Sequence, residues 1–198
     1  MKYFILLLLV IFLGCSNSKQ NQQVQSRHID SSTMLELIEF VLQEDTTQNM
    51  CVYNTLLDFS RENNIPEDYP DSIPPPPPPA NYIDIWDIKY DFKKYANYEL
   101  NHTDSLQSIE QIDKTTKFRL DSLGLQHRVV DRLFLNRDSC DFEVAYVFYT
   151  PLIIVDNKYA LVEYDRILQG QYGLRFRSIF QRENGVWTKI EKYIRWES

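Results

Sequence analysis

Four runs of strand length in the C-terminal third constrain the fold of this chain more than any other feature. They are rich in β-branched and aromatic residues, and they cover Phe142 to Tyr149, Tyr159 to Ile167, Leu174 to Gln181 and Val186 to Trp196. Asn184-Gly185 links the last two with a strong hairpin signal, because both residues tolerate positive φ. The runs predict a four-stranded antiparallel meander. Strict alternation along the last run would place Trp187 and Lys192 on opposite faces.

The N-terminal part predicts helices. After a capping group at Ser31 to Thr33, apolar residues recur at three- and four-residue spacing. A second run continues that period, so two helices, or one with a break, account for residues 32 to 63. The first run comprises Met34, Leu35, Ile38, Val41 and Leu42, and the second comprises Cys51, Val52, Thr55, Leu56 and Phe59. We therefore expect a helical segment at 31–65.

Residues 81–101 fit either a strand or a helix, and we favour a short extended start followed by a helix through Lys94. Thr103-Asp104 can cap a further helix running toward Leu120, with Ser122-Leu123-Gly124 as its end. The expected fold class is α+β: N-terminal helices, then a helix-covered C-terminal four-stranded antiparallel meander. The α+β domain would span 81–198, with its sheet at about 142–197.

A proline-rich stretch at 66–80 separates the two predicted parts. It includes six consecutive prolines from Pro74 to Pro79. Such a run adopts polyproline II, which rises about 3.1 Å per residue and forms a stiff strut. It suits a rigid spacer, and a ligand for a proline-recognising domain is the alternative.

The first residues of the chain form a secretion signal. Lys2 precedes an apolar run from Tyr3 to Leu13, and Gly14-Cys15 end the run before a polar stretch. The run is shorter than the roughly 20 residues that span a bilayer. This pattern resembles the signal peptide of a bacterial lipoprotein, which implies removal of residues 1–14 and lipidation of Cys15. An ordinary signal peptide with an incidental cysteine is the alternative.

Residues 15–30 are polar and predict a flexible tether behind the lipidated cysteine. By resemblance, Ser16 after the cysteine favours the outer membrane of a bacterium. The lack of a following acidic run favours the side that faces the periplasm. A membrane contact through the lipid anchor follows from this interpretation.

The net charge of −7 is unevenly spread along the chain. Residues 30–113 carry 17 acidic and 4 basic side chains, and residues 114–198 carry 11 acidic and 14 basic ones. Faces of opposite sign could steer an envelope protein partner or attract each other within the fold. No dense basic stripe is present, which argues against nucleic acid.

Two cysteines remain once Cys15 is assigned to lipid. Outside the cytoplasm, Cys51 and Cys140 could form a disulfide that contributes about 4 kcal/mol in the chain-entropy model. A buried free thiol at Cys51 is equally natural. Neither cysteine lies in a Cys-x-x-Cys pair, so we expect no metal or redox cofactor.

Motifs for catalysis are lacking, and we assign no catalytic residue. Arg175 and Arg177 share one face of a predicted strand, and Arg166 can lie on its neighbour. Such arginines can grip an anion. The alternative is a wet sheet face on which they pair with cross-strand acids such as Glu163 or Asp165.

The C-terminal portion resembles that of a group of bacterial envelope lipoproteins. The residues that carry the resemblance are Thr150-Pro151-Leu152-Ile153, Asn157 to Val162, Gly173, Asn184 to Trp187 and Trp196. The resemblance implies the sheet and no activity. A fold-level similarity to the helix-covered cone of nuclear-transport-factor-like domains is more distant.

These observations predict an envelope lipoprotein with a non-enzymatic binding or accessory role. A pocket enzyme or ligand-binding protein with a cone-like fold is one alternative. A periplasmic immunity protein is another, because an acidic half suits a basic toxin.

Overall fold

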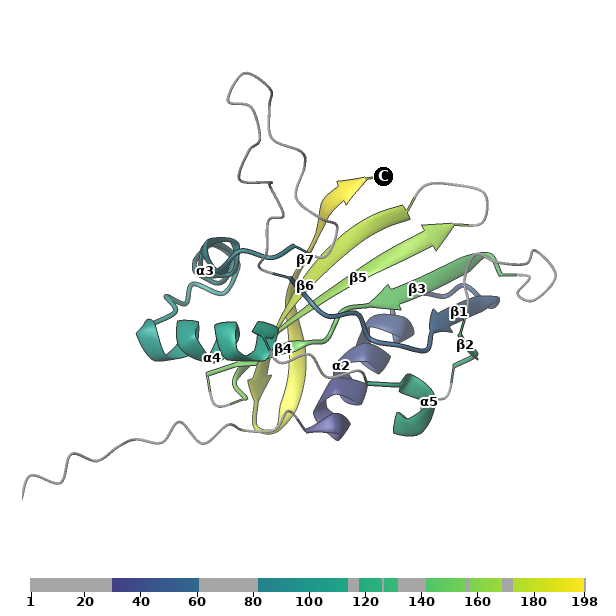
Figure 1. The fold of residues 1–198 in the computed structure, drawn as a ribbon, viewed down its shortest axis with the longest axis horizontal. Helices are drawn as coiled ribbons and strands as arrows, with labels where there is room; N and C mark the ends of the chain where they lie inside the picture. Colours follow the sequence, from purple (N-terminus) through teal and green to yellow (C-terminus); the bar gives the residue numbers. More distant parts are fainter. Residues whose placement is uncertain are drawn as a thin grey trace, which may run out of the picture.

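The computed structural model describes residues 30–60, 82–113, 118–125, 127–131, 142–155, 157–168 and 173–197. Helices and strands alternate along the N-terminal half, and strands make up the C-terminal part (Figure 1). In chain order the elements are α2 (Ser31–Gln43), β1 (Met50–Tyr53), α3 (Ile85–Tyr95), α4 (His102–Asp113), α5 (Leu120–Leu123), β2 (Val129–Val130), β3 (Val144–Phe148), β4 (Leu152–Ile154), β5 (Tyr159–Leu168), β6 (Gly173–Glu183) and β7 (Val186–Glu197).

The strands form one seven-stranded mixed sheet. Its order is β2-β1-β3-β5-β6-β7, and β4 also pairs with β5. The pairs β1–β2 and β1–β3 are parallel, and every other pair is antiparallel. Strands β3 and β4 pair with successive stretches of β5, because Phe148 lies opposite Tyr164 and Leu152 lies opposite Leu161. They therefore act as two halves of one edge beside β5.

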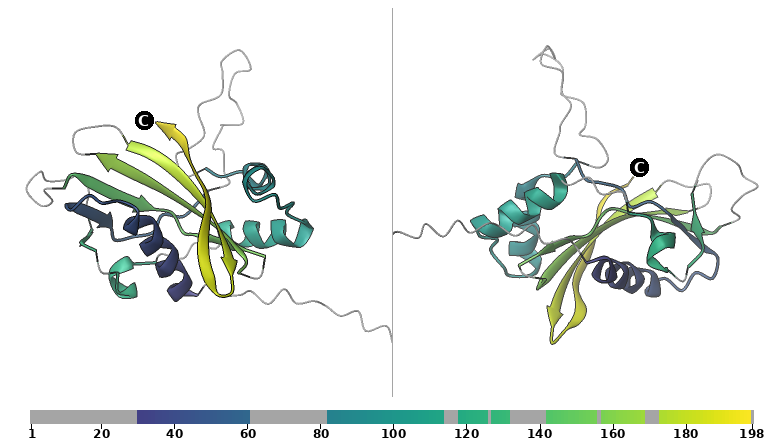
Figure 2. Two further views of the ribbon diagram at one scale, coloured as in Figure 1. Left: turned by 180° about the vertical axis from the view of Figure 1, so that it is seen from behind. Right: turned by 60° about the horizontal axis from the view of Figure 1, so that its bottom comes forward.

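Each face of the sheet packs against different helices, as Figure 2 shows. On one face, the apolar side of α2 joins a core with alternate residues of β3, β5 and β6, among them Phe148, Val162 and Phe180. On the other face, α3 and α4 cover residues such as Leu161 and Ile179. Two cores thus share one sheet, and any side chain of the central strands points into one or the other.

The helix starts follow from side chains that accept backbone hydrogen bonds. The carboxylate of Asp30 accepts from the Ser32 amide at 3.2 Å, and that of Asp84 accepts from the Trp86 amide at 2.8 Å. At the end of α5, Gly124 adopts φ +80°, a conformation that favours glycine. Gly124 thus ends the short helix α5, and not the helix that begins at His102, whose end Ser122-Leu123-Gly124 was expected to mark.

The predicted fold class is wrong. The four expected strands correspond to β3, β5, β6 and β7, but they belong to a seven-stranded mixed sheet and not to a four-stranded antiparallel meander. The second predicted helical run is instead β1, in which Met50 pairs with Val144 and Val52 pairs with Val129. Four residues between two partners carry no period of their own, so pairing with distant segments decides their structure.

Residues 54–60 are also not helical. Beyond β1, Thr55, Leu57 and Ser60 form isolated bridges to other segments, and residues 61–65 lie outside the described residues. The predicted signal peptide at 1–14, nearly all of the predicted tether at 15–30 and the proline-rich stretch at 66–80 also lie outside the described residues. The helix expected through Lys94 is α3, and the next one, α4, ends at Asp113.

Strand β7 does not follow strict alternation. Its register against β6 shifts between Arg175 and Phe176, and again between Ile179 and Phe180. Each shift adds one residue to β7, as a β-bulge does. Trp187 and Lys192 consequently lie on the same face: Trp187 belongs to the core under α2, and the Lys192 ammonium lies over the Phe176 ring of that core.

Candidate functional site

The two arginines expected on one strand face do share a face of β6. This face points toward α3, and both side chains are buried. In the sheet register Arg177 lies opposite Glu163, and Arg175 lies opposite Asp165. Cross-strand pairing with these acids is the alternative that the sequence offered, although the face is buried and not wet.

Arg177 joins the sheet to α3. Its Nε and Nη2 donate to Oε2 of Glu163 at 2.8 and 2.5 Å, and its Nη1 donates to Oδ2 of Asp91 on α3 at 2.5 Å. The Arg177 side chain has no exposed surface. The guanidinium therefore has carboxylates from two different elements within bonding distance, and it fixes the helix over the sheet.

Arg175 continues the chain of charges along β6. It binds Asp165 in a bidentate way, at 2.6 and 2.9 Å, and its Nη1 lies 3.6 Å from Oε1 of Glu163. It also donates to the hydroxyl of Tyr149, whose ring stacks on Phe59 at 5.2 Å. We call the five charged residues the buried ion-pair network: Asp91, Glu163, Asp165, Arg175 and Arg177.

The electrostatics of this network favour fixed charges over proton exchange. Burial lowers the pKa of Arg177, but Glu163 and Asp91 outweigh it and raise that pKa. Burial raises the pKa of Tyr149, and the charge of Asp165 adds to the rise while Arg175 opposes it. Burial likewise lowers the pKa of Arg175, but the nearby acidic groups outweigh it and raise that pKa. Both guanidiniums therefore stay charged within bonding distance of the three acids, as the connections of a scaffold would be.

Arg166 does not join the other two arginines. It points to the opposite face, where its Nε donates to Oδ2 of Asp45 at 2.9 Å, just beyond the end of α2. The Tyr146 hydroxyl and Thr47 donate to the same carboxylate. Burial raises the pKa of Asp45, but the hydrogen bonds from Thr47, Tyr146 and Arg166 outweigh it and hold that pKa well below its usual range.

All three candidate anion contacts are therefore bound to carboxylates of the chain itself. An external anion at Arg166, Arg175 or Arg177 would have to compete with these bonds. The anion contact stays a prediction, and the function proposed below does not use it.

Of the three cysteines, only Cys51 is among the described residues. It is fully buried on β1 and is disulfide-bonded. Cys140 and the predicted lipidation residue Cys15 lie outside the described residues. The pairing of Cys51 with Cys140 stays a prediction.

The outward face of α3 is a feature that the sequence reasoning missed. Trp86 and Tyr90 lie one helical turn apart, and they are 71% and 61% exposed. The Lys89 ammonium lies 5.1 Å from the centre of the Trp86 ring, and that of Lys94 lies 5.5 Å from the Tyr90 ring. We call this set the α3 aromatic–lysine face: Trp86, Lys89, Tyr90, Lys93 and Lys94. The signal was present as two aromatics at i and i+4 outside the apolar stripe.

Two further properties concern ligands and membranes. Among the described residues, no group of three or more histidine, cysteine or acidic side chains is placed to hold a metal ion. None of the described helices combines the length and the hydropathy needed to cross a bilayer. No protein-family model, curated protein or solved structure matches this chain.

Proposed function

We propose that this chain is an envelope lipoprotein whose globular part, held at a membrane by lipid on Cys15, works by binding and not by catalysis. The observation that carries the proposal is the N-terminal pattern of Lys2, an apolar run from Tyr3 to Leu13 and Gly14-Cys15. Two or more acyl chains on one residue hold a protein on a bilayer stably. The first described residue, Asp30, then follows the anchor after the predicted tether of residues 16–29.

The chemistry of the charged residues supports binding over catalysis. A general acid or base works best with a pKa near the working pH. Near the buried ion-pair network, pKa values are shifted away from neutral pH and not toward it, because burial raises the pKa of Tyr149 and of Tyr193. The arginines are engaged with carboxylates. The exposed ring pair on α3 offers a contact surface instead.

Labelling with radioactive palmitate in a bacterial host tests the anchor. Wild-type chain and the control Ser18→Ala should incorporate the label and sediment with membranes, whereas Cys15→Ala should lose the label. Label that persists in Cys15→Ala would refute lipidation at this residue. The control separates loss of the acceptor thiol from a general effect of changing the processed region.

The proposed location needs a separate measurement. We propose the outer membrane, with the globular part facing the periplasm. Density fractionation should then recover the chain with outer-membrane markers. Protease added to intact cells should leave it whole and should digest it once the outer membrane is made permeable. Digestion in intact cells would place the globular part on the cell surface.

A further inference from the structure

Helix α3 holds its outward face rigidly. Its inner side packs Ile88 and Phe92 into the sheet, and Asp91 bonds to Arg177. At its two ends, Asp84 caps the first turn, and the Tyr95 ring stacks on Tyr193 of β7 at 4.9 Å. The rings of the α3 aromatic–lysine face therefore project from a helix that is fixed to the core.

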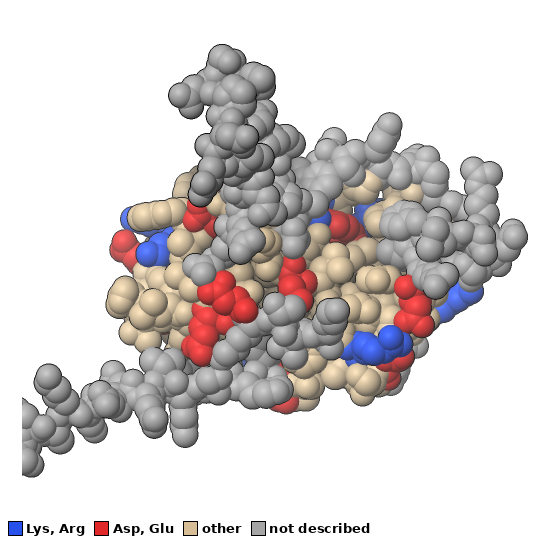
Figure 3. Space-filling view, in the orientation of Figure 1, with Lys and Arg blue, Asp and Glu red and all other residues tan. Residues whose placement is uncertain are grey.

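The charge of this face is opposite to that of the segment around it. Residues 30–113 contain 17 acidic and 4 basic side chains. Three of the four basic ones, Lys89, Lys93 and Lys94, lie on the outward side of α3, and Asp87 of the same helix is turned toward Arg195 at 2.9 Å. In the space-filling view, basic side chains stand at the left edge, where Figure 1 places α3, beside acidic neighbours (Figure 3).

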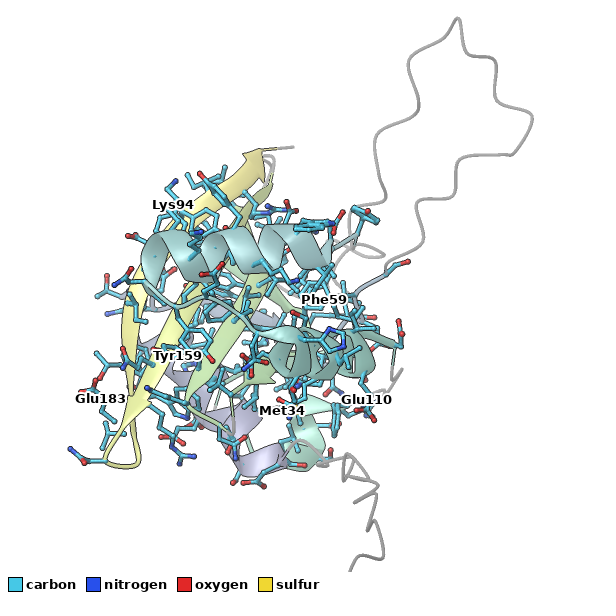
Figure 4. The ribbon with its side chains drawn as sticks, turned by 90° about the vertical axis from the view of Figure 1, so that its left-hand side faces the viewer. Met34, Phe59, Lys94, Glu110, Tyr159 and Glu183 are labelled. Carbon is cyan, nitrogen blue, oxygen red and sulfur yellow. The ribbon has the colours of Figure 1, made fainter. Side chains whose placement is uncertain are left out.

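The composition of the face is that of a membrane-interface contact. Trp and Tyr concentrate at the level of lipid headgroups, where an apolar ring and a polar tip are both accommodated. Lysine side chains add attraction to anionic lipids and extend their apolar stems along the surface. Figure 4 views this side of the molecule, with Lys94 on the outer side of α3 and Tyr159 on the sheet beneath it.

We infer that the α3 aromatic–lysine face rests on the headgroups of anionic phospholipids in the membrane that holds the anchor. This inference rests on the proposed lipid anchor at Cys15. If residues 16–29 form the flexible tether that their composition predicts, its root-mean-square length is about 20 Å and its full reach about 48 Å. Such a link keeps the face near the bilayer at about millimolar effective concentration, so a weak contact suffices.

A neutral glycan is the main competing ligand for exposed rings. Stacking of a sugar on Trp86 and Tyr90 would use the aromatics alone. It would not use the three lysines, which make up most of the basic charge in residues 30–113. Lys93 lies 3.8 Å from Glu99 and Lys94 donates to the Tyr95 hydroxyl at 2.8 Å, and exposed contacts of this kind are weak. The charge complementarity therefore favours the lipid surface.

The test uses the full lipidated chain in vesicles of phosphatidylcholine with or without phosphatidylglycerol, which also contain brominated phospholipids. Bromine quenches tryptophan emission only at short range. The other two tryptophans of the chain are Trp187, which is 3% exposed in the core, and Trp196, and both remain in Trp86→Phe, so this variant measures the background. In anionic vesicles we expect the wild type to be quenched more than Trp86→Phe. The triple variant Lys89→Gln/Lys93→Gln/Lys94→Gln should be quenched no more than Trp86→Phe. Quenching of the wild type should fall markedly in vesicles without phosphatidylglycerol and at high salt.

A matched pair of single variants controls for net charge. Lys93→Gln removes one exposed charge from α3, and Lys158→Gln removes one exposed charge from the turn before β5. Only the first should reduce quenching. Unchanged melting temperatures would show that these surface variants fold normally.

The outcomes separate this inference from the proposed anchor. If the chain floats with vesicles but the wild type is quenched no more than Trp86→Phe, the lipid contact is refuted and the anchor stands. If the wild type does not float, the anchor fails first. Equal quenching with and without phosphatidylglycerol would overturn the role of charge. Retention on purified peptidoglycan that depends on Trp86, without lipid quenching, would assign the face to a glycan.

Discussion

Substitution of Arg177 by methionine tests whether the buried ion-pair network holds α3 to the sheet. Methionine retains most of the side-chain length but leaves Asp91 and Glu163 buried without their shared cation. Removal of one partner from a buried ion pair costs about 3–5 kcal/mol. For a chain of this size, about 1 kcal/mol corresponds to about 2–4 °C. We therefore expect the melting temperature to fall by about 6–20 °C.

Arg195→Met is the matched control. Arg195 also joins β7 to α3, through Asp87 at 2.9 Å, but these side chains are 27% and 42% exposed. An exposed pair contributes less than about 1 kcal/mol. Circular dichroism during heating and urea denaturation should therefore show a much smaller loss than in Arg177→Met.

A triple variant separates charge from packing. The variant Asp91→Leu/Glu163→Met/Arg177→Met removes the guanidinium together with the two carboxylates that it binds. Arg175 keeps its contact with Asp165 at 2.6 Å. Replacement of a whole buried ion cluster by apolar groups is often neutral or stabilising, so most of the stability should return. Equal losses in Arg177→Met and in the Arg195→Met control would refute the reasoning. A triple variant as unstable as the single one would assign the loss to packing.

Three further predictions concern the linkage, the turn and the pH response. Peptide mapping without reductant should join Cys51 to Cys140, and reduction should cost about 4 kcal/mol; two freely reactive thiols in unreduced protein would contradict this. Gly185→Ala should cost about 1 kcal/mol in urea denaturation, because φ is +84° and no atom lies near the new Cβ. Asp45→Asn should cost about 1–2 kcal/mol at pH 7. The pKa of Asp45 is lowered in the fold. Its contribution to the free energy of unfolding is therefore present above its unfolded pKa near 3.9 and is lost as the pH falls below that value. Below this pH the stability difference between wild type and Asp45→Asn should shrink, and a difference that stays constant would contradict the assignment.

Local signals in the sequence were sufficient for some elements. The hairpin at Asn184-Gly185 and the helix Ser31–Gln43 depend on residues close together in the chain. Strand β1 could not be read in this way, because its four residues become a strand only between β2 and β3. Periodicity alone assigned it to a helix.

The contacts of the candidate site also divide into those that the sequence predicts and those that it does not. Pairing of Arg177 with Glu163 follows from adjacent antiparallel strands, and the sequence offered it as an alternative. The contact of Arg177 with Asp91 joins residues that are 86 positions apart, and no local sequence pattern predicts it. The separation of Arg166 from Arg175 follows from the opposite parity of their positions on paired strands. That parity becomes readable only once the register is known.

The position of β1 has a consequence for the order in which the chain can assemble. Any chain emerges N-terminus first, from a ribosome or from a translocation channel, yet β1 pairs with β3, which is made far later. The apolar stripe of α2 likewise packs on residues of β5 and β6. Until those strands arrive, this early segment has no surface to cover it. We expect it to depend on holding chaperones during that interval, and folding to be slow in proportion to these long-range contacts.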